Sequence, residues 1–263
     1  MSSGSADPVR VERDGDLAIA VLDDPPLNLF ADRTFERLRE VRDEIAASDA
    51  RAMVLRAEGD IFTGGVDVHT FAEIGDSTEG RELAARALAD LSCFERLPIP
   101  TLSLVQGLCL TAGLEISLAC DMIWAAQGTQ FGLVERVVGL TPFGGGVQRM
   151  AERAGPARAR EFVMTGGLYP AEKMFEWGVI NRVLPADDLL EKGLKFAHSL
   201  AAGPTVAHEA TKRIVRAYLD GGVEGADRVT AETAAPLFDT EDLKGAVQSF
   251  LTDGPGRATF KGR

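Results

Sequence analysis

Residues 104–124, LVQGLCLTAGLEISLACDMIW, constrain this chain more than any other stretch of its sequence. Nearly every residue in the stretch is apolar, yet Glu115 lies in its middle. A lone carboxylate among apolar side chains is costly unless its pKa rises or it gains hydrogen-bond partners. The stretch is also too interrupted, by Gln106, Gly107 and Gly113 as well as Glu115, to be a membrane span. Glu115 is therefore a candidate for a chemical role.

The pattern around Glu115 predicts a strand at 101–106, a glycine-containing turn at 107–111 and a helix that opens near Ala112. The first N–H groups of a helix have no partner within it and carry the positive end of its dipole. Glu115 lies one turn further on, on the same helix face. An anion-binding N–H group and a possible acid or base are thus expected on one element.

The charge balance restricts the classes of partner. Among 263 residues, 28 are Lys or Arg and 40 are Asp or Glu, which gives a formal net charge of −12. Phosphate backbones are bound by basic faces, so we expect no nucleic-acid partner. A local basic patch would still suit an anionic small molecule.

The cysteines and the N-terminal residues indicate a location. Cys93, Cys109 and Cys120 lie in apolar surroundings without the spacing of metal ligands, so we expect free thiols, no metal site and a reducing compartment. The first 16 residues are polar and contain no apolar core of a signal peptide. We expect a soluble, cytoplasmic protein that makes no contact with a membrane.

Strands and helices alternate along the first three quarters of the chain, which predicts an α/β fold with crossover connections. From about residue 187 the pattern becomes all-helical, and we place a boundary near 195, between segments 1–195 and 196–263. A β-hairpin is predicted with a first strand from Val9, a turn at Asp14-Gly15 and a second strand at 17–22. The other predicted strands are 52–57, 101–106, 120–126 and 178–184, and the predicted helices include 32–47, 81–96, 156–165, 170–177, 187–202, 204–220, 224–237 and 240–251.

Two further glycine-rich segments contain possible site residues. In IFTGGVDVHTF, 61–71, the paired glycines allow a ligand to approach the backbone closely, and the N–H of Val66 follows them at the start of a predicted helix. In TQFGLVERVVGLTPFGGG, 129–146, Glu135 is a second carboxylate in apolar surroundings. The closing glycine run could hold a phosphate, although it matches neither a Walker A motif nor a dinucleotide fingerprint.

These residues suggest acid–base chemistry. Environments that separate the pKa values of Glu115 and Glu135 would let one donate a proton while the other accepts one. Each glutamate could instead be a buried ion-pair partner or lie on a solvated helix face. The N–H groups of Val66 and Ala112 could together bind one oxyanion. His69, His198 and His208 are scattered and show no triad order, and only His69 lies near a glycine pair.

Three segments in order resemble the crotonase family of enoyl-CoA hydratases and isomerases over roughly residues 9–263. They are IFTGGVDVHTF, similar to its first oxyanion loop, VQGLCLTAGLEISLACDMIWAA, similar to its second oxyanion turn, and FGLVERVVGLTPFGGGVQRM, similar to its second acidic loop. The resemblance implies an α/β spiral of ββα repeats with a C-terminal helical trimerisation region, a homotrimer or dimer of trimers, and a place in fatty-acid β-oxidation. It also implies an acyl-CoA thioester substrate and no cofactor beyond the coenzyme A that the substrate carries.

Matched residue by residue, the resemblance makes Val66 and Ala112 the oxyanion N–H positions. Glu115 and Glu135 match the two glutamates that hold water in hydratases, so it implies syn addition of water to a trans-2-enoyl-CoA. Glu115 would deprotonate the water and Glu135 would protonate C2. The substrate-binding residues that we infer with it are Phe62, Gly64, Gly65, Asp67, His69, Gly113, Pro142 and, from the basic tail beside Arg257, Lys261.

The chain departs from the family pattern at four places. Thr111-Ala112-Gly113 is less glycine-rich than the usual turn, Val66 is larger than the frequent Ala, and His69 stands where a Lys is common. Leu133-Val134 replaces a polar-Pro pair. These changes bear on chain-length preference and on the contacts to coenzyme A.

Three functions remain open at this point. The first is an enoyl-CoA hydratase. The second is another crotonase-type enzyme, such as a Δ3,Δ2-enoyl-CoA isomerase, an acyl-CoA hydrolase or a dehydratase; an isomerase would need only Glu135 as its base. The third is a non-catalytic oligomeric acyl-CoA-binding or protein-binding module, which would bind CoA thioesters and turn none over.

Overall fold

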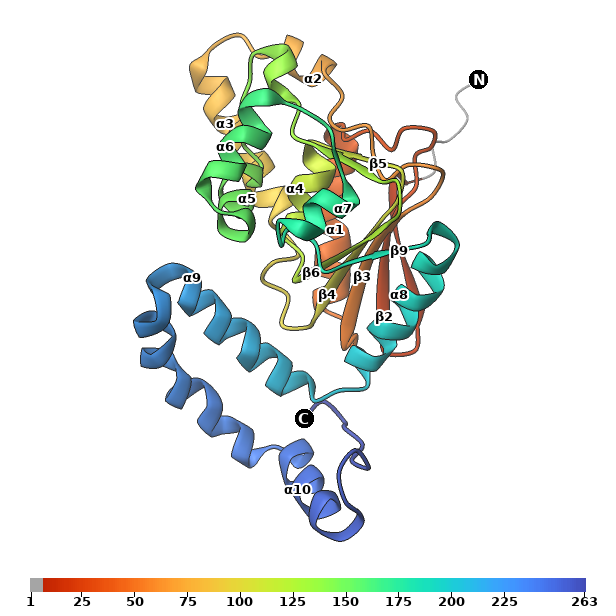
Figure 1. Cartoon of the computed structure of the whole chain (residues 1–263), viewed down its shortest axis with the longest axis vertical. Helices are drawn as coiled ribbons and strands as arrows, with labels where there is room; N and C mark the ends of the chain where they lie inside the picture. The colour runs from red at the N-terminus through yellow and green to blue at the C-terminus, as the bar shows by residue number, and fades with distance from the viewer. Residues whose placement is uncertain (1–6) are drawn as a thin grey trace.

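The computed structural model describes residues 7–263 and contains two sheets surrounded by helices (Figure 1). The larger sheet has six strands in the order β1-β2-β3-β4-β6-β9, and all neighbours are parallel except the β1–β2 hairpin. Its strands are β1 (Val9–Asp14), β2 (Leu17–Leu22), β3 (Ala52–Ala57), β4 (Thr101–Val105), β6 (Met122–Ala126) and β9 (Arg182–Leu184). The smaller sheet has the order β5-β7-β8 and consists of β5 (Leu108–Leu110), β7 (Gln130–Gly132) and β8 (Tyr169–Pro170).

Helices cover both faces of the larger sheet. The α-helices are α1 (Asp32–Ala46), α2 (His69–Ala72), α3 (Ser77–Leu91), α4 (Ala112–Leu118), α5 (Gly146–Ala154), α6 (Pro156–Thr165), α7 (Ala171–Glu176), α8 (Ala186–Ala201), α9 (Thr205–Ala234) and α10 (Glu241–Asp253). Two 3₁₀ helices are η1 (Glu135–Val138) and η2 (Ala235–Asp239). This arrangement agrees with the predicted α/β class and helical C-terminal region.

Strand β2 explains why the sheet is covered on both sides. All six of its residues, LAIAVL, are buried. Successive strand side chains point to opposite faces, so an unbroken apolar run needs cover on both. Leu17, Ile19 and Val21 belong to the core cluster that contains α8, while Ala18 and Ala20 belong to the cluster that contains α1 and α4. In Figure 1, α8 accordingly lies on the opposite side of the sheet from α1 and α4.

Some element boundaries differ from the sequence prediction. The turn expected at 107–111 contains β5, which pairs with β7 in the smaller sheet. The helix expected at 81–96 spans Ser77–Leu91. It begins earlier than predicted because the Asp76 side chain caps it, accepting hydrogen bonds from the N–H groups of Thr78 and Glu79. β5, β7 and β8 were not predicted; each is only two or three residues long, which is too short for a periodicity of its own.

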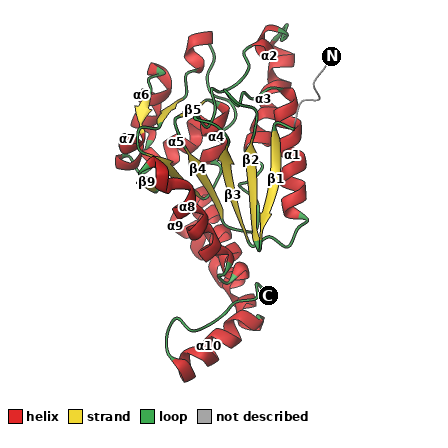
Figure 2. Cartoon of the chain, turned by 90° about the vertical axis from the view of Figure 1, so that its right-hand side faces the viewer, coloured by secondary structure: helices red, strands yellow, loops and turns green. Residues whose placement is uncertain are grey.

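The C-terminal helices leave the body as an extended arm, with α10 at its far end (Figure 2). The break predicted between 204–220 and 224–237 is present inside α9, where Gly221 and Gly222 have non-helical dihedral angles. The boundary predicted near 195 lies inside α8, whose Ala197 and Ala201 pack against the sheet, and the arm itself begins with α9. The division into 1–195 and 196–263 as domains stays a prediction.

Two further expectations concern the cysteines and the absence of a membrane span. Cys93, Cys109 and Cys120 are buried free thiols, as the sequence predicted. Of the helices in residues 7–263, none has the combined length and apolar character needed to cross a bilayer.

Candidate active site

Glu115 lies in the first turn of α4 and is only 4% exposed. Its carboxylate is held by the glycine run that precedes α5: the N–H of Gly146 donates to Glu115 Oε1 at 2.9 Å. A Cβ atom on Gly144 would lie 2.6 Å from Glu115 Oε2, so a side chain there would displace the carboxylate. The glycine run therefore accommodates a carboxylate of this chain, and the phosphate-holding role that its composition allowed is not supported.

Glu135 begins η1 and is 8% exposed. Its Oε2 atom is buried and has no hydrogen-bond partner among the described residues. A buried polar atom without a partner is unusual in a native protein, because its desolvation is not offset. The sequence had left two ordinary roles open for Glu135, a buried ion-pair partner or a residue on a solvated helix face. Its environment fits neither of them.

The environments of the two glutamates raise both pKa values by different amounts. Burial raises the pKa of Glu115 to about 6, against the opposing effect of the Gly146 and Gly144 N–H groups. Burial also raises the pKa of Glu135 to about 7, and the charge of nearby Glu115 adds to this effect. Because the two carboxyl groups interact, they titrate as a pair, and over part of the range around neutral pH the pair holds a single proton.

Two loops bring the proposed oxyanion positions together. The loop 61–66 pairs with the end of the larger sheet and with β5, through bonds from Phe62 N to Gln106 O at 2.9 Å and from Thr63 N to Leu108 O at 3.0 Å. The N–H of Val66 donates to Thr111 Oγ1 at 3.1 Å. Thr111 immediately precedes Ala112, the first residue of α4, whose N–H has no acceptor within the helix. The N–H groups of two distant sequence segments are thus neighbours in the fold.

Glycines allow this close approach. Gly65 has φ of +104°, a left-handed conformation that side chains disfavour, and a Cβ atom there would lie 2.4 Å from Thr111 Oγ1. A Cβ atom on Gly113 would lie 1.9 Å from the Cγ2 atom of Thr63. Because neither glycine has a side chain, the loop and the N-terminus of α4 are in direct contact.

The remaining inferred binding residues surround this contact, with one exception. Phe62 is fully buried beneath the loop, whereas His69 is exposed and its Nδ1 lies 2.7 Å from Asp67 Oδ1. Pro142 is buried in the loop after η1, next to Phe143, whose ring meets that of Phe71 on α2 at 6.2 Å. This aromatic pair joins segment 129–146 to segment 61–71. Gly64 lies in the same loop, against Leu29.

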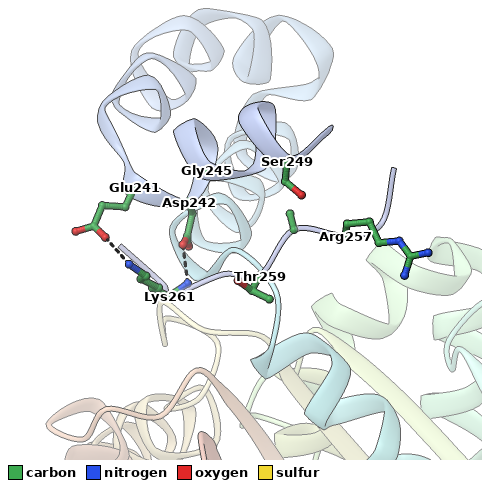
Figure 3. Close-up of a pocket in the computed structure, with 8 residues that line it drawn as sticks. Glu241, Asp242, Gly245, Ser249, Arg257, Thr259 and Lys261 are labelled. Atoms are coloured by element: carbon green, nitrogen blue, oxygen red, sulfur yellow. Dashed lines mark hydrogen bonds and ion pairs between the residues drawn. The ribbon is translucent and has the colours of Figure 1, made fainter. Parts of the chain in front are cut away.

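Lys261 is the exception, because it lies with the C-terminal arm (Figure 3). Its backbone N–H donates to Asp242 Oδ1 at 2.6 Å, and its Nζ atom lies 3.2 Å from Glu241 Oε2. The Arg257 side chain points away from these acidic groups in Figure 3. The structure of a single chain therefore does not bring Lys261 to the glutamates, and its contact with coenzyme A stays a prediction.

A model of the enoyl-CoA hydratase/isomerase family matches residues 12–261, nearly the whole chain. The chain belongs to this family. It is therefore an enzyme of the crotonase type, with the α/β crotonase fold that its resemblance implied.

Individual relatives agree with the family assignment. The short-chain-enoyl-CoA hydratase of Clostridium acetobutylicum is 26% identical over 246 residues, which cover 92% of this chain and 94% of that protein. An enoyl-CoA hydratase structure from Geobacillus kaustophilus superposes with a TM-score of 0.90 at 27% identity, over 97% of this chain and 98% of that one. The enoyl-CoA hydratase of Bacillus anthracis, at 23% identity, has the same fold with a TM-score of 0.90 over 97% of this chain and 100% of that one.

Two residues of this crotonase site were not among the sequence candidates. Thr111 was noted only as a departure from a glycine-rich turn, yet its hydroxyl contacts Val66. Arg149 on α5 is buried, and its Nη2 atom lies 2.6 Å from Glu95 Oε2 and 3.0 Å from Ser92 Oγ. Its positive charge opposes the rise of the Glu115 pKa. The sequence around Arg149 resembles that of any amphipathic helix, so it does not indicate that this arginine is buried near Glu115.

The raised pKa of Glu135 predicts a pH-dependent stability. Between its unfolded value of 4.5 and about 7, the folded chain keeps a proton that the unfolded chain has released, so the free energy of unfolding falls as pH rises through this window. The loss amounts to about 3 kcal/mol. The glutamine side chain of the Glu135→Gln variant cannot ionise, so this variant does not lose that stability. The Tm of the variant minus the Tm of the wild type should therefore rise by roughly 6–10 °C between pH 4.5 and pH 8.

Differential scanning fluorimetry across this pH range, at one protein concentration, measures the effect. Glu172→Gln, which removes an exposed carboxylate on α7, is the matched control. A Tm difference between Glu135→Gln and wild type that does not change with pH would contradict the raised pKa.

Proposed function

We propose that this chain is an enoyl-CoA hydratase that adds water syn across the double bond of a trans-2-enoyl-CoA. The observation that carries the proposal is the buried pair Glu115 and Glu135, whose charges interact and whose pKa values are raised to about 6 and about 7. Such a pair, with one proton between the two groups, supplies a base and an acid at the same pH. The similarity to the short-chain-enoyl-CoA hydratase of Clostridium acetobutylicum supports the same reaction.

In the proposed reaction both carboxyl groups hold the attacking water. Ionised Glu115 takes a proton from the water as its oxygen bonds to C3, and neutral Glu135 gives its proton to C2. One water is consumed and the pair again holds one proton, now on Glu115. That proton must return to Glu135 before the next turnover.

Electron density moves onto the thioester oxygen while water adds to C3. We propose that the N–H groups of Val66 and Ala112 form the oxyanion site for this oxygen. Donors that are fixed before the reaction strengthen as charge develops, and each is typically worth about 10²–10³ in rate. The contact between loop 61–66 and the N-terminus of α4 supports this role, because it holds the two donors in adjacent positions.

The proposal includes the substrate and the setting of the enzyme. Coenzyme A would lie over residues 62–69 as part of the substrate, with His69 near its nucleotide, and no separate cofactor takes part. We further propose a cytoplasmic location, which the three buried free thiols support, and a role in fatty-acid β-oxidation.

The test is an assay of purified protein with crotonyl-CoA and with a longer trans-2-enoyl-CoA, following the loss of the conjugated thioester absorbance. Rapid loss with one of them, and formation of the 3-hydroxyacyl-CoA, is the expected result. Tight binding of both thioesters with no turnover would contradict the proposal and would favour a binding module. Turnover of only a 3-enoyl-CoA would favour an isomerase.

We also propose that the chain assembles as a trimer or a dimer of trimers. Large apolar side chains are exposed on the helical arm, among them Val223, Phe238, Phe250 and Leu251, with exposed fractions of 60–76%. Light scattering should therefore give about 84 kDa, three times the 28.1 kDa chain, or twice that value. Phe250→Asp combined with Leu251→Asp should lower the mass, and a wild-type protein of 28.1 kDa would contradict the proposal.

A further inference from the structure

Thr111 has a backbone conformation that its side chain does not favour. Its φ of 44° and ψ of −118° are those of the first central residue of a type II′ turn, where glycine is normal. A β-branched residue there is a genuine outlier, and such outliers cluster at functional sites. Strain of this kind persists only where the surroundings compensate for it.

Helix capping does not supply the compensation. Thr111 is the N-cap residue of α4, a position at which a threonine hydroxyl usually accepts an N–H from its own helix. Here no such bond forms. The hydroxyl oxygen instead accepts the N–H of Val66 from the other loop, at 3.1 Å. The Thr111 hydroxyl is thus hydrogen-bonded to the Val66 N–H, which is one of the two N–H groups assigned to the proposed oxyanion site.

The hydroxyl still has a hydrogen to donate. A threonine hydroxyl is both an acceptor and a donor. The Thr111 side chain is largely buried, and none of residues 7–263 accepts a hydrogen bond from its hydroxyl. The free donor lies one residue before Ala112, so it is next to the other N–H group of the site.

We propose that Thr111 Oγ1–H is itself a donor to the thioester oxygen, and that the N–H of Val66 acts through it. In place of the Val66 N–H proposed above, the Thr111 hydroxyl would then be the second direct donor of the oxyanion site, beside the Ala112 N–H. The Val66 N–H would polarise that hydroxyl and fix its position, because successive hydrogen bonds strengthen one another. Thr111 is then a catalytic residue and Val66 a positioning residue. The inference rests on the proposed function, whose substrate oxygen it concerns.

The test uses a conjugated enoyl-CoA with an electron-donating aromatic group, whose absorption shifts to the red when its thioester carbonyl is polarised. Thr111→Ser keeps the hydroxyl and should keep the red shift, with kcat for hydration within about threefold of wild type. Thr111→Val replaces the hydroxyl by a methyl group that covers the Val66 N–H. It should lose most of the red shift and lower kcat by about 10²-fold, while Kd for the probe changes less.

Two further variants complete the design. Thr111→Ala removes the hydroxyl but leaves the Val66 N–H open, so its red shift and kcat should fall between those of the serine and valine variants; it also replaces the valine variant if that does not fold. Thr129→Val removes another fully buried hydroxyl, which bonds to Val105 O at 3.3 Å, and should leave the red shift unchanged.

The outcomes separate the two proposals. Full red shift and wild-type kcat in both the valine and the alanine variants would overturn the inference alone. An alanine variant at least tenfold faster than wild type would also overturn it, by showing that the hydroxyl obstructs the Val66 N–H. A wild-type protein that binds the probe without a red shift, and hydrates no enoyl-CoA, would contradict the proposed function.

Discussion

Glu135→Gln and Glu115→Gln should each lower kcat for hydration of a trans-2-enoyl-CoA by about 10²–10⁴-fold, because each removes one general acid–base group. The two variants act on different protons. Glu135→Gln removes the proton that C2 receives, and Glu115→Gln removes the base that accepts a proton from water. Both substitutions nearly preserve side-chain shape and leave a neutral group in a buried place, so the fold should be kept.

The comparison of the two variants also distinguishes among crotonase-type activities. Steady-state kinetics with crotonyl-CoA and a 3-enoyl-CoA should be run on both, with Glu172→Gln on α7 as a control that removes an exposed carboxylate. An enzyme whose activity survives Glu115→Gln but not Glu135→Gln uses a single base, as an isomerase would. Activity that survives both substitutions would contradict the assignment of the pair.

The second large effect is expected from Gly113→Ala. The new Cβ atom would lie 1.9 Å from Thr63 Cγ2, so α4 and loop 61–66 would have to move apart. Overpacking of this kind costs about 1–3 kcal/mol in stability. The same movement would separate the N–H groups of Val66 and Ala112, and a displacement of about 1 Å can lower a rate by about 10²-fold.

A second substitution should reverse this loss. Thr63→Ser removes the Cγ2 atom that the new Cβ atom would meet. It keeps the hydroxyl, which donates to Asn28 O at 2.7 Å and accepts the N–H of Gly65 at 2.9 Å. The double variant Gly113→Ala/Thr63→Ser should therefore recover most of the kcat and Tm that Gly113→Ala loses, as a coupled pair in a double-mutant cycle.

Gly245→Ala is the matched control for this cycle. Gly245 is also a helical glycine, on α10, but a Cβ atom there would meet nothing within 4 Å. Alanine is favoured over glycine inside a helix, so this control should be neutral or slightly more stable. If Gly113→Ala behaves like Gly245→Ala in both kcat and Tm, the contact between the loop and α4 does not set the geometry of the site.

Local sequence patterns determined most of the secondary structure and the family. The unbroken apolar run of β2 required cover on both faces of a sheet, and it has that cover. The break in the last long helix followed from Gly221 and Gly222, because glycine tolerates the dihedral angles that end a helix turn. Glu115 and Glu135 were identifiable because a carboxylate in apolar surroundings is costly wherever the chain places it.

Relations between distant segments become visible only in the folded chain. The sequence could not show that Glu115 lies against Gly146, 31 residues further along, or that the charges of the two glutamates interact. It gave no signal for Lys261 pairing with Glu241 on the arm, since both residues are ordinary surface charges.

Thr111 illustrates the difference between the two levels. Its sequence position shows only that a threonine replaces a glycine in a turn. Its conformation and its bond to Val66 depend on loop 61–66 arriving beside α4. Composition and periodicity are properties of neighbours along the chain, whereas hydrogen bonds, desolvation and pKa values depend on neighbours in space. Local sequence therefore identifies which groups are available for catalysis, and the packing of the two loops sets how they face one another.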